Sequence, residues 1–189
     1  IRHMVVSAQA FLSGDKVSNC LIHPGVKTTT HKKQRGEIET ALSSITYNHK
    51  TPAMIQAFKA EYDLMDPKKS PKQSYEAIEA RIFKMLEDRA YKILVLNSKS
   101  ADDSTDYQSG CNFIIGGTNL SRGVTFGGLN TFYYTRSSKA PQADTMWQHN
   151  RIFGYDRDPG ITTVYITQTL YQLFIDINET NNAIIDNIT

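Results

Sequence analysis

The sequence lacks several features that would point to common classes of protein. Two cysteines in 189 residues are too few for a disulfide framework, and no apolar run approaches the length that crosses a bilayer. The 21 basic and 19 acidic residues leave a formal net charge of +2, so composition neither indicates nor excludes a nucleic-acid partner. No Gly-x-x-x-x-Gly-Lys-Ser/Thr pattern occurs, which excludes a P-loop of that pattern within these residues.

The start of the chain also lacks the usual signals. It begins with Ile1 rather than Met, and its first residues do not resemble a secretory signal. We therefore expect it to be part of a longer, cytoplasmic protein. Cys20 and Cys111 each begin an apolar, strand-like run, and we expect both to be buried free thiols in a reducing compartment.

What is present is an alternation of strand-like and helix-like segments. Five apolar runs are nearly continuous, which is typical of strands buried on both faces; they cover residues 20–23, 92–96, 111–115, 131–134 and 163–166. Helical patterns cover residues 4–12, 30–45, 52–65, 74–89, 143–153 and 169–188. The alternation predicts a three-layer α/β fold with a mostly parallel sheet flanked by helices. We expect the aromatic residues of the strands to lie in the core.

Three segments allow local predictions. Thr51 is placed to cap a helix whose first residue is Pro52. Residues 98–110 are polar and acidic, which predicts a flexible surface loop. The polar run 178–182 interrupts the apolar pattern of the last helix and suggests a break in it.

Residues 114–126 form the first informative motif. A strand ends at Gly116-Gly117, and a polar loop with Thr118, Asn119 and Ser121 leads to Arg122-Gly123. Small residues at the carboxyl end of a strand let a ligand approach the backbone, and hydroxyl and amide groups can bind phosphates. The alternative is an ordinary tight loop, because glycine-rich turns are common in α/β folds.

Residues 143–158 form the second motif. Trp147 and Arg151 are one helical turn apart, and Arg151 and Arg157 flank an aromatic-rich stretch. An arginine delivered across an interface can stabilise the charge that develops on a transferred γ-phosphoryl group. The alternative is that these arginines form ion pairs with nearby carboxylates, for which Asp144, Asp156 and Asp158 are candidates.

The two motifs together resemble motifs V and VI of superfamily-two helicases. They are more closely similar to the Z1 (Z-one) domain, which is found in large ATPases linked to restriction and phage defence. The resemblance is carried by Gly116, Gly117, Leu120, Ser121, Arg122, Gly123 and Thr125, and then by Asp144, Thr145, Gln148, Arg151, Phe153, Gly154 and Tyr155. Residues 21–23 also resemble the first strand of such a lobe. Asn150 replaces the usual glycine before the arginine, and an additional Asp156 leaves the register of Arg157 open.

The resemblance implies that residues 1–168 form the second RecA-like lobe of a DNA-dependent ATPase, a helicase or translocase. Residues 169–189 would be a helical extension that packs on this lobe or on a following domain. ATP and Mg²⁺ would be held mainly by a preceding RecA-like lobe of the same protein, so the chain alone is expected to be inactive. Arg151 would be the arginine finger with Arg157 as its helper, while the nucleotide cleft would be lined by Gly123, Thr125 and Gln148.

The resemblance also implies contacts with the DNA backbone. They would come from His23, Thr28, Thr118, Asn119, Ser121 and Arg122. The nearby cations Lys27, Lys32, Lys33 and Arg35 fit a phosphate-binding edge, or equally a solvated helix face. A nuclease subunit or domain is a further partner, and no membrane partner is expected. The histidines are scattered and have no cysteine at ligand spacing, so we expect no metal site within the chain.

Two other function classes are compatible with the same fold. One is a degenerate RecA-like module that docks a nuclease and has no role in ATP hydrolysis. The other is a small-molecule enzyme that binds a phosphate-bearing cofactor at Gly116-Gly117, although these glycines lack the full dinucleotide fingerprint. DNA-stimulated hydrolysis of ATP would distinguish the motor from both.

Overall fold

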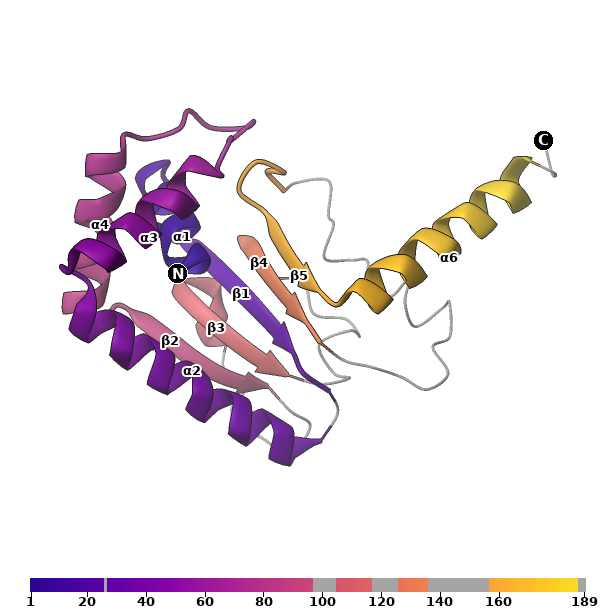
Figure 1. Ribbon diagram of the computed structural model, residues 1–189, viewed down its shortest axis with the longest axis horizontal. Coiled ribbons are helices and arrows are strands. Elements are labelled where there is room, and N and C mark those ends of the chain that lie inside the picture. The colour runs from indigo at the N-terminus through magenta and orange to yellow at the C-terminus, as the bar shows by residue number, and fades with distance from the viewer. Residues whose placement is uncertain (26, 97–104, 117–125, 136–156, 187–189) are drawn as a thin grey trace.

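The computed structural model describes residues 1–25, 27–96, 105–116, 126–135 and 157–186. These residues form an α/β domain whose elements are shown in Figure 1. In chain order they are α1 (Arg2–Leu12), β1 (Val17–His23), α2 (Thr28–Asn48), α3 (Pro52–Asp63), α4 (Tyr75–Glu87), β2 (Tyr91–Leu96), the 3₁₀ helix η1 (Thr105–Gln108), β3 (Gly110–Gly116), β4 (Leu129–Tyr134), β5 (Thr163–Ile166) and α6 (Gln168–Asp186).

The five strands form one parallel sheet in the order β2-β3-β1-β4-β5. All five predicted strands are present, and four of them begin one to three residues earlier than their apolar runs. The order changes direction at β1, because β2 and β3 lie on one side of it and β4 and β5 on the other. In open α/β sheets the ligand crevice lies at such a switch point, beyond the carboxyl ends of the strands.

Both faces of the sheet are covered, which explains the nearly continuous apolar runs. On one face, the inward residues of β1 and β3 pack with helices α1 to α4. On the other face, the alternate strand residues pack with η1 and with the first half of α6. The predicted three-layer α/β fold is therefore confirmed. Cys20 and Cys111 are both buried free thiols, as predicted.

The helix starts follow from local side-chain chemistry. The Thr51 hydroxyl accepts a hydrogen bond from the Met54 N–H at 3.4 Å, and Pro52 occupies the first turn of α3. The Ser74 hydroxyl accepts from the Ala77 N–H at 3.2 Å at the start of α4. Each cap satisfies one of the backbone donors that a helix leaves unpaired at its amino end. The cap predicted at Thr51 is confirmed.

Helix α1 is the central element of the helical layer. Its residues from Arg2 to Ala10 are all buried between the sheet and helices α3 and α4. A polar network joins this helix to the strands: the Ser7 hydroxyl donates to Ser18 Oγ at 2.8 Å, and His3 Nδ1 lies 3.1 Å from Thr131 Oγ1. Buried polar groups need such partners, because an unsatisfied one costs about 1–3 kcal/mol.

Three local expectations differ from the structure. Thr105–Gln108, at the end of the expected loop, forms η1, whose Tyr107 ring lies 5.0 Å from the ring of Phe126. Helix α6 runs unbroken through residues 178–182, since their polar side chains can face solvent without breaking the hydrogen-bond ladder. Tyr133 and Tyr165 are 41% and 39% exposed rather than buried, with ring centroids 6.1 Å apart.

The extension that begins near residue 169 packs only in part. Leu170 is buried in the sheet core, with Leu173, Phe174 and Ile177 half-buried beside it. Toward its carboxyl end α6 projects away from the sheet (Figure 1), and Ile184 and Ile185 are more than half exposed. None of the helices in the described ranges is both long and apolar enough to cross a membrane.

The buried imidazole of His3 makes the stability of the fold depend on pH. Burial lowers the pKa of His3 from 6.5 to about 3, so the unfolded chain binds a proton more readily than the folded one. We expect the free energy of unfolding to be fully retained above pH 6.5 and to fall as the pH drops toward 3. At its steepest, the contribution of His3 to the free energy of unfolding falls by about 1.4 kcal/mol per pH unit.

The measurement is urea unfolding between pH 7.5 and 4.5 for the wild type, His3→Asn and, as a control, His49→Asn. His49 lies at a helix end beside Glu87, outside the network. The His3 variant should lose most of the pH-dependent difference, and the control should retain it. Equal pH profiles for the wild type and the His3 variant would contradict the assignment.

Candidate functional site

The carboxyl edge of the sheet carries the first group of predicted site residues. β1 ends at His23 beside Tyr134 of β4, and β3 ends at Gly116. The loop with Thr118, Asn119, Ser121, Arg122, Gly123 and Thr125 begins directly after this strand end, but these residues lie outside the described ranges. Their assignment to nucleotide and DNA stays a prediction.

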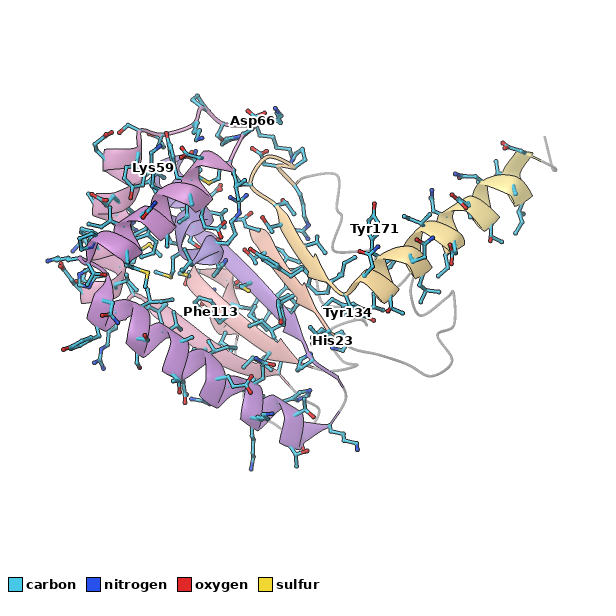
Figure 2. All side chains as sticks on the ribbon, viewed as in Figure 1. His23, Lys59, Asp66, Phe113, Tyr134 and Tyr171 are labelled. Carbon is cyan, nitrogen blue, oxygen red and sulfur yellow. The ribbon has the colours of Figure 1, made fainter. Side chains whose placement is uncertain are left out.

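His23 is at the predicted edge, but its ring is part of the packed structure. The residue is 3% exposed, and its ring meets Tyr134 edge-on at 5.3 Å between centroids. Figure 2 shows the two labelled side chains at the same end of the sheet. The Thr135 N–H also donates to the His23 carbonyl at 3.3 Å. In this conformation the imidazole is not presented to a phosphate, and its contact with DNA stays a prediction.

Thr28 lies at the same edge, in the first turn of α2. It is exposed, and the helix start is held to the preceding loop by His31, whose Nε2 lies 2.8 Å from the Gly25 carbonyl oxygen. Lys33 and Arg35 form exposed ion pairs with Glu37 and Glu39, one turn further along the helix. Such pairs contribute about 0–1 kcal/mol, so these cations lie on a solvated helix face that could still meet a polyanion.

Arg157 lies at the opposite, amino edge of the sheet. Its guanidinium donates to the carbonyls of Leu129, at 3.3 Å, and Phe126, at 3.5 Å. Leu129 is the first residue of β4 and Tyr134 is the last, so the two edges are about 16 Å apart at 3.3 Å per residue. The structure therefore separates Arg157 from His23 and Thr28. Arg151 and Gln148 lie outside the described residues.

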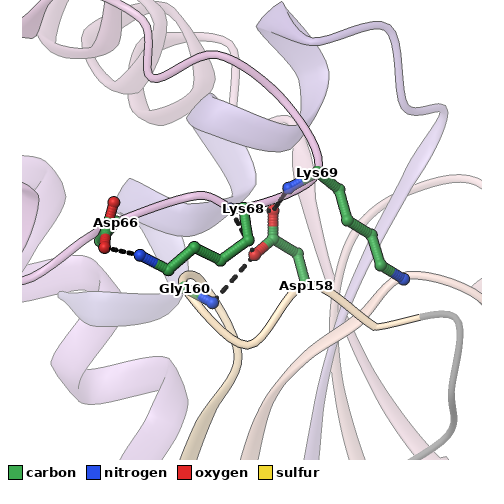
Figure 3. Close-up of polar contacts among 5 residues, drawn as sticks. All are labelled: Asp66, Lys68, Lys69, Asp158 and Gly160. Atoms are coloured by element: carbon green, nitrogen blue, oxygen red, sulfur yellow. Dashed lines mark hydrogen bonds and ion pairs between the residues drawn. The ribbon is translucent and has the colours of Figure 1, made fainter.

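The carboxylate of Asp158 binds the segment beside Arg157 to the loop between α3 and α4. This set of hydrogen bonds is called the Asp158 clamp below. Its carboxylate accepts hydrogen bonds from the backbone N–H of Lys68 at 3.0 and 3.1 Å, of Lys69 at 3.0 Å and of Gly160 at 2.9 Å. Figure 3 shows these contacts, together with the ion pair between Lys68 and Asp66. The bond to Gly160 is an Asx turn, which the Asp158-Pro159-Gly160 sequence favours.

Gly160 is required where the two segments cross. The Asp66 N–H donates to the Gly160 carbonyl at 3.2 Å. A Cβ atom at Gly160 would lie 1.6 Å from the Asp66 carbonyl oxygen. No side chain fits there without separating the two backbones.

The environment of Asp158 favours its charged form. Burial alone would raise the pKa of this carboxyl group, but the amide N–H groups of Lys68, Lys69 and Gly160 outweigh burial and lower the pKa below its usual 3.8. The carboxylate is therefore charged across the neutral range, and its clamp is intact there.

A polar cavity of about 270 Å³ adjoins the clamp at the amino edge. It is lined by Gln9, Ala10, Ser13, Asp15, Lys16, Val17, Pro67, Lys69, Ser70, Gly128, Asn130, Arg157, Asp158 and Ile161. The sequence analysis selected Arg157 and named Asp158 as a candidate ion-pair partner, but it missed the other polar lining residues. The Asp-Pro-Gly sequence was the available signal for the turn beside them. Within the described ranges, no group of three or more His, Cys, Asp or Glu side chains could hold a metal.

Substituting Gly160 tests the crossing point. We expect Gly160→Ala to lower the free energy of unfolding by roughly 2–4 kcal/mol, because overpacking against backbone cannot be relieved by a rotamer change. Gly36→Ala is the matched control: nothing lies within 4 Å of its added Cβ, and alanine in a helix should stabilise by up to about 1 kcal/mol. Chemical denaturation measures both, and similar values for the two variants would contradict the crossing geometry.

Substituting Asp158 tests the clamp through its acid dependence. We expect Asp158→Asn to cost about 1.5–3 kcal/mol at pH 7, because hydrogen bonds to a charged acceptor are lost. The folded pKa lies below 3.8, so the wild-type advantage should be complete above that pH and disappear as the pH falls further. Denaturant titrations from pH 7 to 2.5 measure it, and a constant difference between the two proteins would rule out a charged clamp.

The comparisons with known proteins identify the family. A search of curated proteins and a search of solved structures found no match. The model of one family, described as the Z1 domain, matches residues 3–189. That match includes both the carboxyl edge and the clamp at Asp158. The chain belongs to the Z1 domain family.

Proposed function

We propose that this chain is the second motor lobe of a DNA-dependent ATPase, a helicase or translocase. The full-length protein would serve a restriction or other phage-defence system, with which Z1 domains are associated. The observation that carries the proposal is the pair of motifs at 114–126 and 143–158, in a chain whose family membership covers both.

The sheet topology supports the binding of nucleotide and DNA in this proposal. The loop of the first motif starts from the carboxyl end of β3, next to β1, where the strand order changes direction. That is the position at which open α/β sheets bind nucleotides and other ligands. Thr28 and the amino end of α2 begin close to the same edge. Helix amino ends favour anions, which supports a DNA backbone along this edge.

Catalysis in this proposal depends on two arginines. Arg151 would bring positive charge to the γ-phosphoryl group as its transfer to water proceeds, and Arg157 would assist. The described structure holds Arg157 at the amino edge through the carbonyls of Phe126 and Leu129, away from the strand end that leads into the first motif. The helper role would therefore require this side chain to leave those carbonyls. Gly123, Thr125 and Gln148 would line the nucleotide cleft.

The first lobe would hold ATP and Mg²⁺, since this chain contains no P-loop pattern. Transfer of the γ-phosphoryl group of ATP to water would change the distance between the lobes. A nuclease subunit or domain is the proposed effector.

The test is steady-state ATP hydrolysis by the full-length protein that carries this chain, with and without DNA. We expect DNA to stimulate the wild type and Arg151→Ala to lower the stimulated kcat on the order of 10³-fold, as loss of an arginine finger does. ATP affinity should change only a few-fold. Lys84→Ala is the control, because Lys84 is an exposed cation paired with Asp88 on α4, and it should behave as the wild type.

Unchanged hydrolysis by Arg151→Ala would remove the finger assignment. A wild type without DNA-stimulated hydrolysis would exclude the motor function and favour a module that docks a nuclease.

A further inference from the structure

Two tyrosines on neighbouring strands are exposed, although the sequence predicts them in the core. Tyr133 of β4 and Tyr165 of β5 are paired in the register of the sheet, with ring centroids 6.1 Å apart and planes tilted by 46°. Helix α2 packs mainly on β2 and β3, and α1 contacts β4 and β5 two residues earlier, through Thr131 and Thr163. The described helices therefore leave both rings accessible from one face of the sheet.

A surface hollow of about 530 Å³ lies beside these rings. Tyr171, which is 51% exposed in the first turn of α6, adds a third ring, and Figure 2 shows it where α6 leaves the sheet. Thr135, Thr167 and Gln168 contribute hydroxyl and amide groups to the lining. The described residues that line the hollow include no charged side chain. These residues therefore offer aromatic faces and neutral hydrogen-bonding groups to a ligand.

The hollow adjoins the carboxyl edge of the sheet. Thr135 and Thr167 directly follow the last residues of β4 and β5. The Thr135 N–H donates to the carbonyl of His23, the last residue of β1, at 3.3 Å. Lys27 and Thr28, both exposed, lie at the start of α2 at the same edge. A DNA backbone bound along this edge would therefore have the hollow beside its path.

We propose that Tyr133, Tyr165 and Tyr171 form a platform on which bases of single-stranded DNA stack. Aromatic rings on neighbouring strands of a sheet can stack successive bases, and they do so without reading sequence because every base has a flat π-face. Neutral hydroxyl and amide groups suit the polar edges of the bases. Bases inside a duplex are covered by their neighbours and cannot reach the rings.

The inference rests on the proposed function for its choice of DNA as the ligand. It deepens that function by naming the form of DNA that this lobe holds and the residues that touch its bases. It does not depend on the arginines or on ATP hydrolysis.

Fluorescence anisotropy of a labelled oligo(dT) of about 20 nucleotides, without nucleotide and at constant ionic strength, measures binding to the chain. We expect Tyr133→Leu/Tyr165→Leu to weaken binding at least about tenfold, since loss of aromatic stacking commonly has an effect of that size. Tyr133→Phe/Tyr165→Phe keeps both rings and should bind within about twofold of the wild type. Tyr47→Leu is the matched control, because Tyr47 is 88% exposed near the other end of α2.

Two further ligands separate the bases from the phosphates. An abasic oligomer of the same length has the same charge but nothing to stack, so the wild type should bind it at least about tenfold more weakly than oligo(dT). A duplex of the same length should bind the wild type and the leucine variant alike, because its bases are already paired and stacked. The comparison of oligo(dT) with the abasic oligomer uses the wild type alone, so it tests base recognition even if the leucine variant does not fold.

Four results would overturn the inference. They are the absence of saturable oligo(dT) binding by the wild type, equal affinity of the wild type for oligo(dT) and the abasic oligomer, equal affinity of the leucine variant and Tyr47→Leu for oligo(dT), and equal losses in the leucine and phenylalanine variants. A changed oligomeric state of the leucine variant with unchanged oligo(dT) binding would assign the hollow to a protein partner instead.

The two proposals can fail separately. Failure of these titrations would leave the ATPase proposal standing, because the first lobe and the arginines would still carry hydrolysis. Conversely, a full-length protein without DNA-stimulated hydrolysis would exclude the motor and leave base stacking by the tyrosines unaffected.

Discussion

The packing of the domain depends on one buried helix whose polar side chains all require hydrogen-bond partners. Helix α1 is buried from Arg2 to Ala10, yet it carries Arg2, His3, Ser7 and Gln9. Arg2 donates to Thr163 of β5 at 2.9 Å and to the Glu61 carbonyl of α3 at 2.7 Å. His3 and Ser7 bond to β4 and β1, and the Gln9 amide bonds to both Pro71 and Gln73. Each bond fixes one element relative to the helix, so α1 sets the position of the sheet and of the loop that Asp158 binds.

Most of the fold could be predicted because its signals are local or periodic. Strands buried on both faces give continuous apolar runs, and Thr51-Pro52 marks a helix start by chemistry that acts within one turn. Tyr133 and Tyr165 were predicted wrongly for a different reason. A strand pattern shows that a residue is apolar, but it does not show how far the neighbouring layer extends over the sheet. The helix break predicted at residues 178–182 was wrong, because polar residues on the solvent side of a helix each lower its stability by well under 1 kcal/mol.

The site at the amino edge was largely unpredictable from sequence because its partners are backbone groups and distant loops. Arg157 binds two carbonyls, and Asp158 binds three N–H groups. Every residue has a carbonyl and nearly every one has an N–H, so no residue type marks the ones that meet a side chain. Lys16 and Lys69 lie far from Arg157 in sequence, and only the tertiary fold brings them to the same cavity. The carboxyl-edge loops, in contrast, carry their small and hydroxyl residues in one continuous stretch.

The Asp158 clamp uses backbone donors. The shape of the loop at residues 68 and 69 is therefore set separately from the chemistry of its side chains. The hydrogen bonds of the clamp use the N–H groups of residues 68 and 69 and not their side chains, while the charge of Lys69 helps to lower the pKa of Asp158. Proline is barred there, since it has no N–H, but other side chains keep the clamp intact. A change of side chain at position 69 therefore keeps the backbone hydrogen bonds that shape this wall of the cavity. Substitution of Lys69 thus changes the charge of the cavity wall but not the backbone scaffold beside Arg157.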